Sequence, residues 1–158
     1  MRHLLFILLA ICITSCASEP AEKWASLDLT PYNVPITIQA PDSAEVKSSS
    51  LSGVIQDVTI KSTEEDYSVQ VLGSQAVTND MTRLKAEQLE LVRDNRYFES
   101  IVSEEPNGFI FQNRIDTTAI YGFRYIIYQG DKEYVFQNGF DGTFGLPEIE
   151  AMYAAVKQ

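Results

Sequence analysis

Apolar and polar residues alternate with a period of two along most of the chain after residue 33, the pattern typical of half-buried strands. Turn-forming residues bound several of these segments, and the shortest connection, Gln129 to Lys132, predicts a tight hairpin. The predicted strands cover, in order, residues 34–39, 54–60, 67–73, 99–103, 109–115, 119–128 and 134–140.

The segment 119–128 differs from the others because it is apolar on both faces, which predicts a central strand covered on both sides. We therefore expect Phe123 and Ile127 to be core residues. Three tyrosines, Tyr121, Tyr125 and Tyr134, share one face of the predicted sheet. We expect them in the core as well; the alternative is an exposed aromatic platform for a glycan or partner.

Two segments have the helical period instead. The first holds helix formers from Leu84 to Leu91, after a capping residue at position 78, 79 or 80, and its apolar face extends as far as Phe98. Gln88 and Asn95 interrupt that face. We expect both amides at its margin, bonded to backbone; the alternative is a polar pocket between helix and sheet.

The second predicted helix ends the chain. Pro147 suits its first turn, and Glu148 and Lys157 complement the helix dipole at its two ends. A stripe of apolar residues follows one face, formed by Leu146, Ile149, Met152, Tyr153 and Val156.

The N-terminal residues have a different pattern. A basic start, Met1-Arg2-His3, precedes the uncharged segment 4–13, which is shorter than the about 20 residues that a membrane-spanning helix needs. A basic region, an apolar stretch of this length and small residues after it predict a secretory signal over residues 1–15.

The end of this signal, Ile13-Thr14-Ser15-Cys16, resembles the lipobox of bacterial lipoproteins. The resemblance implies cleavage before Cys16, a diacylglycerol on its sulfur and, usually, a further acyl chain on its new amino group. A lipid anchor with two or more chains holds a protein stably at a membrane. Ala17 stands where an aspartate would resemble an inner-membrane retention signal, so we expect the outer membrane, with the domain in the periplasm or on the cell surface.

The lipidated Cys16 is expected to be followed by a flexible tether over residues 16–33, because Pro20 and Pro31 interrupt it and charged residues keep it solvated. Trp24 is its one large apolar side chain; docking on the domain and placement at lipid headgroups remain equal alternatives. Residues 34–158 are then predicted to form a single globular domain.

Composition excludes several classes of function. The chain has 12 basic and 22 acidic residues, a net charge of −10, which speaks against nucleic acid as a partner. Without residues 1–15 it holds no histidine, and its remaining cysteine, Cys16, is blocked by lipid. Catalytic sites with a histidine base and Cys/His zinc sites then cannot form, nor can a disulfide within one chain. Carboxylate chemistry, hard-cation binding or no catalysis remain, and we expect no cofactor.

The segment Asn138–Gly145 is rich in glycine and oxygen ligands but lacks the residue order of a calcium loop. We expect a turn at a strand end there and assign no metal ligands, leaving cation binding open. The acidic tip at residues 64–66 is likewise expected to be a solvated loop.

The order of elements over residues 34–157 resembles the PsbP-like and DcrB-like domains, through the helix at 82–87, the strand pair 125–128 and 133–136, and the last helix. The resemblance implies an α+β fold: an α/β/α sandwich, with an antiparallel sheet packed against a long middle helix and a short C-terminal helix. It supplies no catalytic residues.

The expected function is a non-catalytic binding or accessory module of the cell envelope. It would be held at the membrane by its lipid anchor and have an envelope protein or glycan as partner. The alternative is a carboxylate-dependent hydrolase acting on envelope polysaccharide, which needs two carboxyl groups facing one cleft about 5–10 Å apart.

Overall fold

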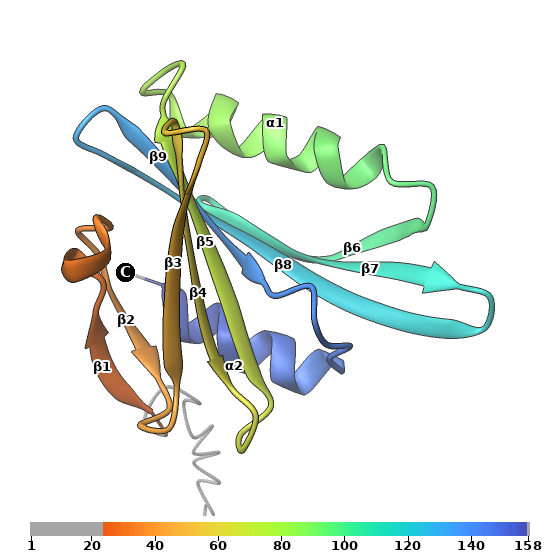
Figure 1. The fold of residues 1–158 in the computed structure, drawn as a ribbon. Coiled ribbons are helices and arrows are strands. Elements are labelled where there is room, and N and C mark those ends of the chain that lie inside the picture. Colours follow the sequence, from red (N-terminus) through yellow and green to blue (C-terminus); the bar gives the residue numbers. More distant parts are fainter. Residues whose placement is uncertain (1–23, 158) are drawn as a thin grey trace, which may run out of the picture.

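The computed structural model describes residues 24–157, and Figure 1 shows them as a strongly twisted sheet with one helix on each side. The helices are α1 (Met81–Arg93) and α2 (Leu146–Val156), and a short 3₁₀ helix spans Thr30–Tyr32. In chain order the strands are β1 (Ala25–Asp28), β2 (Thr37–Ala40), β3 (Glu45–Leu51), β4 (Ile55–Ser62), β5 (Tyr67–Gln75), β6 (Phe98–Glu105), β7 (Gly108–Ile115), β8 (Thr118–Gln129) and β9 (Lys132–Asn138).

Seven strands form one antiparallel sheet in the order β3-β4-β5-β9-β8-β7-β6, and β1 and β2 form a separate two-stranded sheet. The large sheet joins two meanders, β3-β4-β5 and β6-β7-β8-β9, along the β5–β9 edge, where Val71 lies opposite Phe136. The predicted tight hairpin is present between β8 and β9, with Gly130 and Asp131 both at positive φ (59° and 61°). Positive φ at both central positions is the geometry of a type I′ turn.

The predicted α/β/α sandwich with a long middle helix is wrong. The described residues are mostly β structure: seven strands in one sheet, two in another, and helices of only 13 and 11 residues. The middle helix ends at Arg93, because Asp94 and Asn95 turn the chain, and the Phe98 amide bonds to the Asn95 carbonyl at 2.8 Å. Phe98, which the helical period had placed on the helix, is the first residue of β6.

The expected tether over residues 16–33 is wrong for its last ten residues. Residues 25–28 form β1 against β2, and Leu29 is fully buried in the main core. Trp24 docks on the domain: its ring lies 4.8 Å from that of Tyr67, and its Nε1 donates to Glu65 Oε2 at 3.0 Å. A four-residue strand between prolines has too little alternation to be recognised. The predicted signal and the Cys16 lipidation site lie outside the described residues.

The main core lies between the sheet and α2. Tyr153 of α2 contacts Phe123 and Tyr125 of β8 edge to face, with ring centroids 5.8 and 5.9 Å apart. Tyr125 and Tyr134 are buried, so these two tyrosines belong to the core, and Tyr121 is half-buried. The exposed-platform alternative is therefore not what the fold forms.

The opposite face of the sheet carries α1. Leu84 of α1, capped at its N-terminus by the side chain of Asp80, packs on Ile126 and Val135. The prediction that strand 119–128 is covered on both faces is confirmed for β8, in which Phe123 is fully buried and Ile127 half-buried. Neither helix in residues 24–157 has the length and apolar composition that a membrane crossing requires.

Candidate functional site

A row of polar side chains crosses the sheet on the face that carries α1. Antiparallel partners lie directly opposite each other and point to the same side of a sheet. By this register Thr59 lies opposite Gln70, Gln70 opposite Gln137, and Gln137 opposite Arg124. The row therefore runs across β4, β5, β9 and β8, at the middle of the sheet, where the other face is apolar core.

Side-chain hydrogen bonds join the two glutamines of this row and connect them to Asp57. Gln137, only 4% exposed, donates through Nε2 to Gln70 Oε1 at 2.7 Å, and Gln70 Nε2 donates to Asp57 Oδ1 at 2.9 Å. A buried amide is tolerated when its polar atoms are bonded in this way. These two hydrogen bonds hold the side chain of Asp57, which lies on β4 two residues before Thr59.

Arg124 ends the row and is the unusual member. Its Nη1 donates to the Phe123 carbonyl at 2.9 Å, and its guanidinium lies 5.6 Å from the centre of the Phe111 ring. Within residues 24–157 it forms no ion pair with a carboxylate. Burial lowers the pKa of Arg124 to about 10, so the group stays cationic at neutral pH but is poorly solvated.

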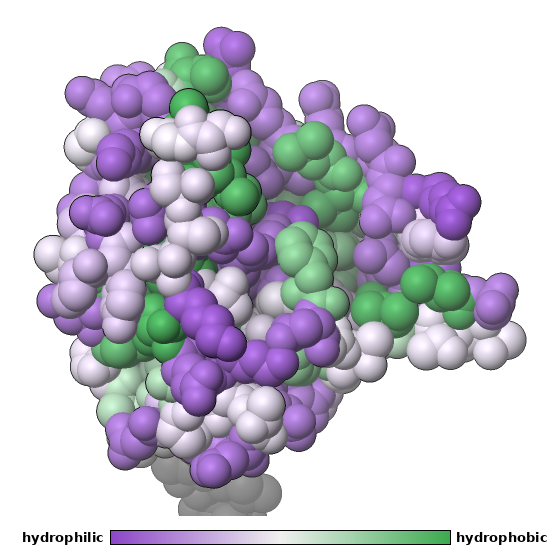
Figure 2. Space-filling model, viewed as in Figure 1, coloured by the Kyte–Doolittle hydropathy of each residue, from purple (hydrophilic) through white to green (hydrophobic). Residues whose placement is uncertain are grey.

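A groove in two parts opens over this row. The larger hollow, about 450 Å³, lies between α1 and strands β3, β4, β5 and β9, and the smaller, about 280 Å³, lies over β7 and β8. Leu91, Arg124 and Phe140 line both hollows, which places them at the junction. Figure 2 shows apolar patches flanking a recessed polar area between β3 and α1.

Two of the junction residues are apolar and exposed. Leu91 on α1 is 67% exposed, and Phe140, just after β9, is 83% exposed. The larger hollow is mostly apolar, lined by Leu51, Ile55, Leu72, Leu91, Val135 and Phe140. Large exposed apolar side chains gathered around a concavity are typical of a binding surface.

The two amides on the predicted helix face have different outcomes. Asn95 is exposed and its Oδ1 accepts the Tyr97 backbone amide at 3.0 Å, as expected for an amide at the margin, whereas half-buried Gln88 fits the pocket alternative. Gln88 lines the larger hollow and Asn95 the smaller. Gln88 hydrogen-bonds Glu133, whose pKa is raised by burial and by repulsion from Glu87, against the lowering effect of that bond. In the described part of the chain, Glu133 Oε1 and Asn113 Oδ1 are buried acceptors without a donor.

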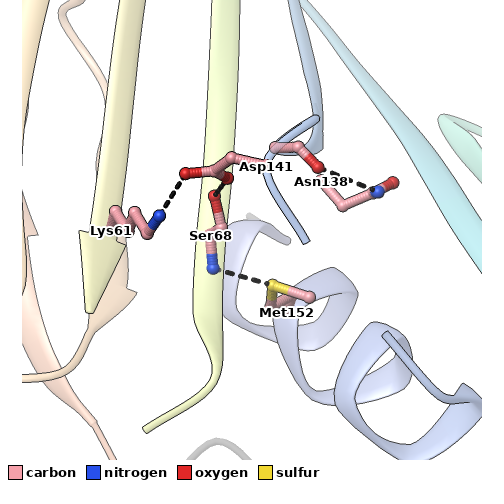
Figure 3. A network of polar contacts seen from close by, with 6 residues as sticks. Lys61, Ser68, Asn138, Asp141 and Met152 are labelled. Carbon is pink, nitrogen blue, oxygen red and sulfur yellow. Dashed lines mark hydrogen bonds and ion pairs between the residues drawn. The ribbon is translucent and has the colours of Figure 1, made fainter. Parts of the chain in front are cut away.

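The loop after β9 forms one rim of the groove and is clamped from below (Figure 3). Asp141 accepts a hydrogen bond from Ser68 Oγ at 3.1 Å and forms an ion pair with Lys61. Ser68 in turn accepts the Gly139 amide on its carbonyl at 2.9 Å, and its own amide points at Met152 Sδ, 3.3 Å away. The clamp holds Phe140 over the groove.

The same contacts occupy the main candidate cation ligand of the Asn138–Gly145 segment, the Asp141 carboxylate. Lys61 and Ser68 engage the Asp141 carboxylate, and Lys61 lowers its pKa. Asn138 Oδ1 accepts the Phe123 amide at 3.3 Å. Over residues 24–157 no three His, Cys, Asp or Glu side chains converge on a common point. The segment acts in this structure as a turn tied to β4 and β5.

One residue of this site carries a signal that is visible in the sequence. Arg124 is a charge in the middle of the most apolar strand, between two buried aromatics, and a charge partly withdrawn from water requires a reason. Gln70, Gln137 and Asp57 carried no such signal, because polar residues alternating along a strand are ordinary on an exposed face.

Comparison of the chain with protein-family models, with curated proteins and with solved structures finds no match.

Proposed function

We propose that this chain is a lipid-anchored, non-catalytic binding module of the cell envelope, and that the groove between α1 and the sheet is its ligand site. The observation that carries the proposal is Arg124: a half-buried cation without a carboxylate partner among the described residues, at the junction of two hollows. An arginine in such a setting is an incomplete interaction that a ligand can complete. The sequence before residue 17, with its signal and the lipobox-like Ile13–Cys16, supports the anchor.

The arrangement of the domain suits a tethered module. Trp24, where the described chain begins, docks beside the β4–β5 turn, through Tyr67 and Glu65. In Figure 1 this turn lies at the bottom of the molecule and α1 at the top. An anchor attached to the chain before Trp24 would leave the groove turned away from the membrane and accessible.

Two measurements in cells test the proposal. A fatty-acid probe should label the wild-type chain and leave Cys16→Ala unlabelled, because only that thiol follows the lipobox-like segment. A photocrosslinking p-benzoylphenylalanine at position 91 should give a defined adduct on irradiation. The same residue at position 77, equally exposed but outside the groove, is the control. Equal labelling of wild type and Cys16→Ala would contradict the lipid anchor. Identical background crosslinking at positions 91 and 77 would contradict the ligand site.

A carboxylate-dependent hydrolase is the second candidate, because Asp57 and Glu133 both line the larger hollow. The raised pKa of Glu133 suits a general acid, and Asp57 could serve as a base. The two residues stand on β4 and β9, with β5 between them, so their strands lie about 10 Å apart. The test is hydrolysis of envelope polysaccharide by the purified protein. Activity in the wild type that is lost in both Asp57→Asn and Glu133→Gln would favour the hydrolase over the binding module.

A further inference from the structure

The two hollows of the groove differ in chemistry, and the difference indicates what kind of ligand fits. The smaller hollow has no Asp or Glu in its lining. Arg124 is its only charged group, accompanied by neutral hydrogen-bonding side chains: Asn95, Asn113, Asn138 and Tyr121. The lining of this hollow therefore carries a positive charge that no carboxylate in the same lining compensates, in a chain of net charge −10.

The larger hollow continues from it past Leu91 and Phe140. Most of its exposed wall surface is apolar, although polar residues such as Gln70 and Gln88 also line it, and its size lies within the range of about 300–1,000 Å³ common for small-molecule sites. Its two carboxylates, Asp57 and Glu133, make it unsuitable for an anionic group. An apolar chain placed there would cover the half-buried Leu72, together with the exposed faces of Leu91 and Phe140.

We propose that the groove binds a single-chain amphiphile with an anionic head, a carboxylate or a phosphate monoester. The head lies in the smaller hollow on the Arg124 guanidinium, and the alkyl chain lies in the larger hollow beneath Leu91 and Phe140. This inference rests on the proposed function, since it assigns a ligand class to the same groove. A guanidinium held in an apolar setting binds such oxygens through short, charge-assisted hydrogen bonds.

Other occupants fit the observations less well. A nucleic acid is disfavoured by the net charge, and a neutral glycan would leave Arg124 without a counter-charge. A second copy of this chain could also cover Leu91 and Phe140. The test below separates a second copy from a small amphiphile.

The experiment uses the full chain, purified from membranes and placed in lipid nanodiscs. The probe is a dodecanoic acid carrying a photoactivatable diazirine in its chain, and the readout is the amount of label on each peptide by mass spectrometry. We expect label on peptides from β5, β9 and α1 that line the larger hollow. Label on the lipid and scaffold is the same in all samples and does not affect the comparison.

Charge variants test the head. Arg124→Gln should lower groove labelling about tenfold or more, the usual effect of losing a charged hydrogen-bond partner. Arg93→Gln, the same change on an exposed position of α1 outside both hollows, should leave it unchanged. Arg124→Lys keeps the charge and should retain part of the labelling. Thermal melts of each variant confirm that it is folded.

Competition tests the head and the chain without any substitution, so the proposal stays testable if Arg124→Gln does not fold. Unlabelled dodecanoate and dodecyl phosphate are compared as competitors of the probe. The one that competes at the lower concentration shows whether the groove prefers a carboxylate or a phosphate monoester head. Dodecyl maltoside, with the same chain and a neutral head, should compete at least tenfold more weakly, and inorganic phosphate, without a chain, should not compete. Phe140→Ser should weaken labelling, and Val77→Ser should not.

Three results would overturn the inference. They are equal labelling in Arg124→Gln, equal competition by the neutral dodecyl maltoside, and crosslinked dimers with the groove unlabelled. If these occur while the position-91 crosslinker still captures a defined adduct in cells, the groove remains the ligand site and only the ligand class is wrong. If the position-91 adduct is absent as well, the proposed function fails together with it.

Discussion

The two faces of the central sheet are built from the same strands but for different purposes. Toward α2, side chains such as Phe123, Tyr134 and Phe136 are fully or almost fully buried and pack into one continuous core. Toward α1, the same strands carry Arg124, Gln137 and Glu133, and the contacts with the helix form two smaller apolar clusters around a groove. A strand alternates its side chains, so it can supply stability on one face and a binding surface on the other.

This comparison predicts that substitutions on neighbouring residues of β8 act in different ways. Face alternation, and not position along the chain, should decide the outcome. Substitutions of Phe123 and Arg124 test this directly, and substitutions of Gly139 and Asp141 test the loop that forms the rim of the groove; they are ordered from the largest expected effect to the smallest.

Phe123→Ala should destabilise the fold strongly. Phe123 is fully buried on the α2 face and contacts the Tyr153 ring, so its loss leaves a cavity that the surrounding strands cannot close. We expect a loss of about 3–5 kcal/mol in the free energy of unfolding, measured by urea denaturation. Phe140→Ala, which removes an equally large but exposed ring, is the matched control and should cost little. A wild-type midpoint for Phe123→Ala would mean that the α2 face is not the main core.

Gly139→Ala should destabilise the rim of the groove by about 1–3 kcal/mol. A Cβ at this position would lie 2.1 Å from Ser68 Oγ, which is inside any permitted contact, and 3.1 Å from Ser68 Cβ. The loop must move, and the clamp on Asp141 moves with it. The double variant Gly139→Ala, Ser68→Ala removes the nearer atom and should recover part of the loss, in a double-mutant cycle measured by thermal melts. Additive losses would show that the close approach is not what limits the loop.

The groove face could be predicted from sequence only in part, for physical reasons. The period-two segments identified seven strands, because burial on one face imposes that pattern. The pattern missed β3, where Ser48, Ser49 and Ser50 are exposed on both sides of an edge strand, and β1, which is four residues long.

The groove itself depends on which strands are neighbours. Arg124 and Gln137 are 13 positions apart and meet only because β8 pairs with β9, while Gln70 meets Gln137 through the β5–β9 pairing. No local sequence pattern predicts the contact between Gln70 and Gln137, because α1 and the strands β6, β7 and β8 lie between these residues in the chain. The charge at Arg124 was visible in the sequence, but its neighbours were not.

Arg124→Met should leave stability within about 1 kcal/mol of wild type, or raise it. The substitution removes a poorly solvated cation that has no carboxylate partner in the described residues and keeps an apolar side chain of similar length over Phe111. One hydrogen bond, to the Phe123 carbonyl, is lost. The measurement is the denaturation midpoint of Arg124→Met beside that of Phe123→Ala. A loss as large as that of Phe123→Ala would mean that Arg124 is a structural residue of the core, and the two-face comparison would fail.

The smallest expected effect is the pH dependence of the loop clamp. Lys61 and the Ser68 hydroxyl lower the pKa of Asp141 below its ordinary value of about 3.9. A carboxyl whose folded-state pKa is depressed stabilises the fold above its unfolded pKa, and this contribution disappears as the pH falls through the folded-state pKa. The window therefore lies below about pH 4, and neutral pH shows the full contribution.

Asp141→Asn tests this window directly. Because the pair is half-exposed, we expect a loss of at most about 1 kcal/mol at pH 7, screened by added salt. At pH 2–3 the difference between wild type and variant should shrink, since the wild-type carboxyl is then becoming protonated as well. Glu64→Gln, which changes an exposed charge in the β4–β5 turn, should show no such convergence. A difference that is constant from pH 7 to pH 2 would assign the effect of Asp141 to its Ser68 hydrogen bond and not to its charge, and the loop would then be held over the groove without electrostatic help from β4.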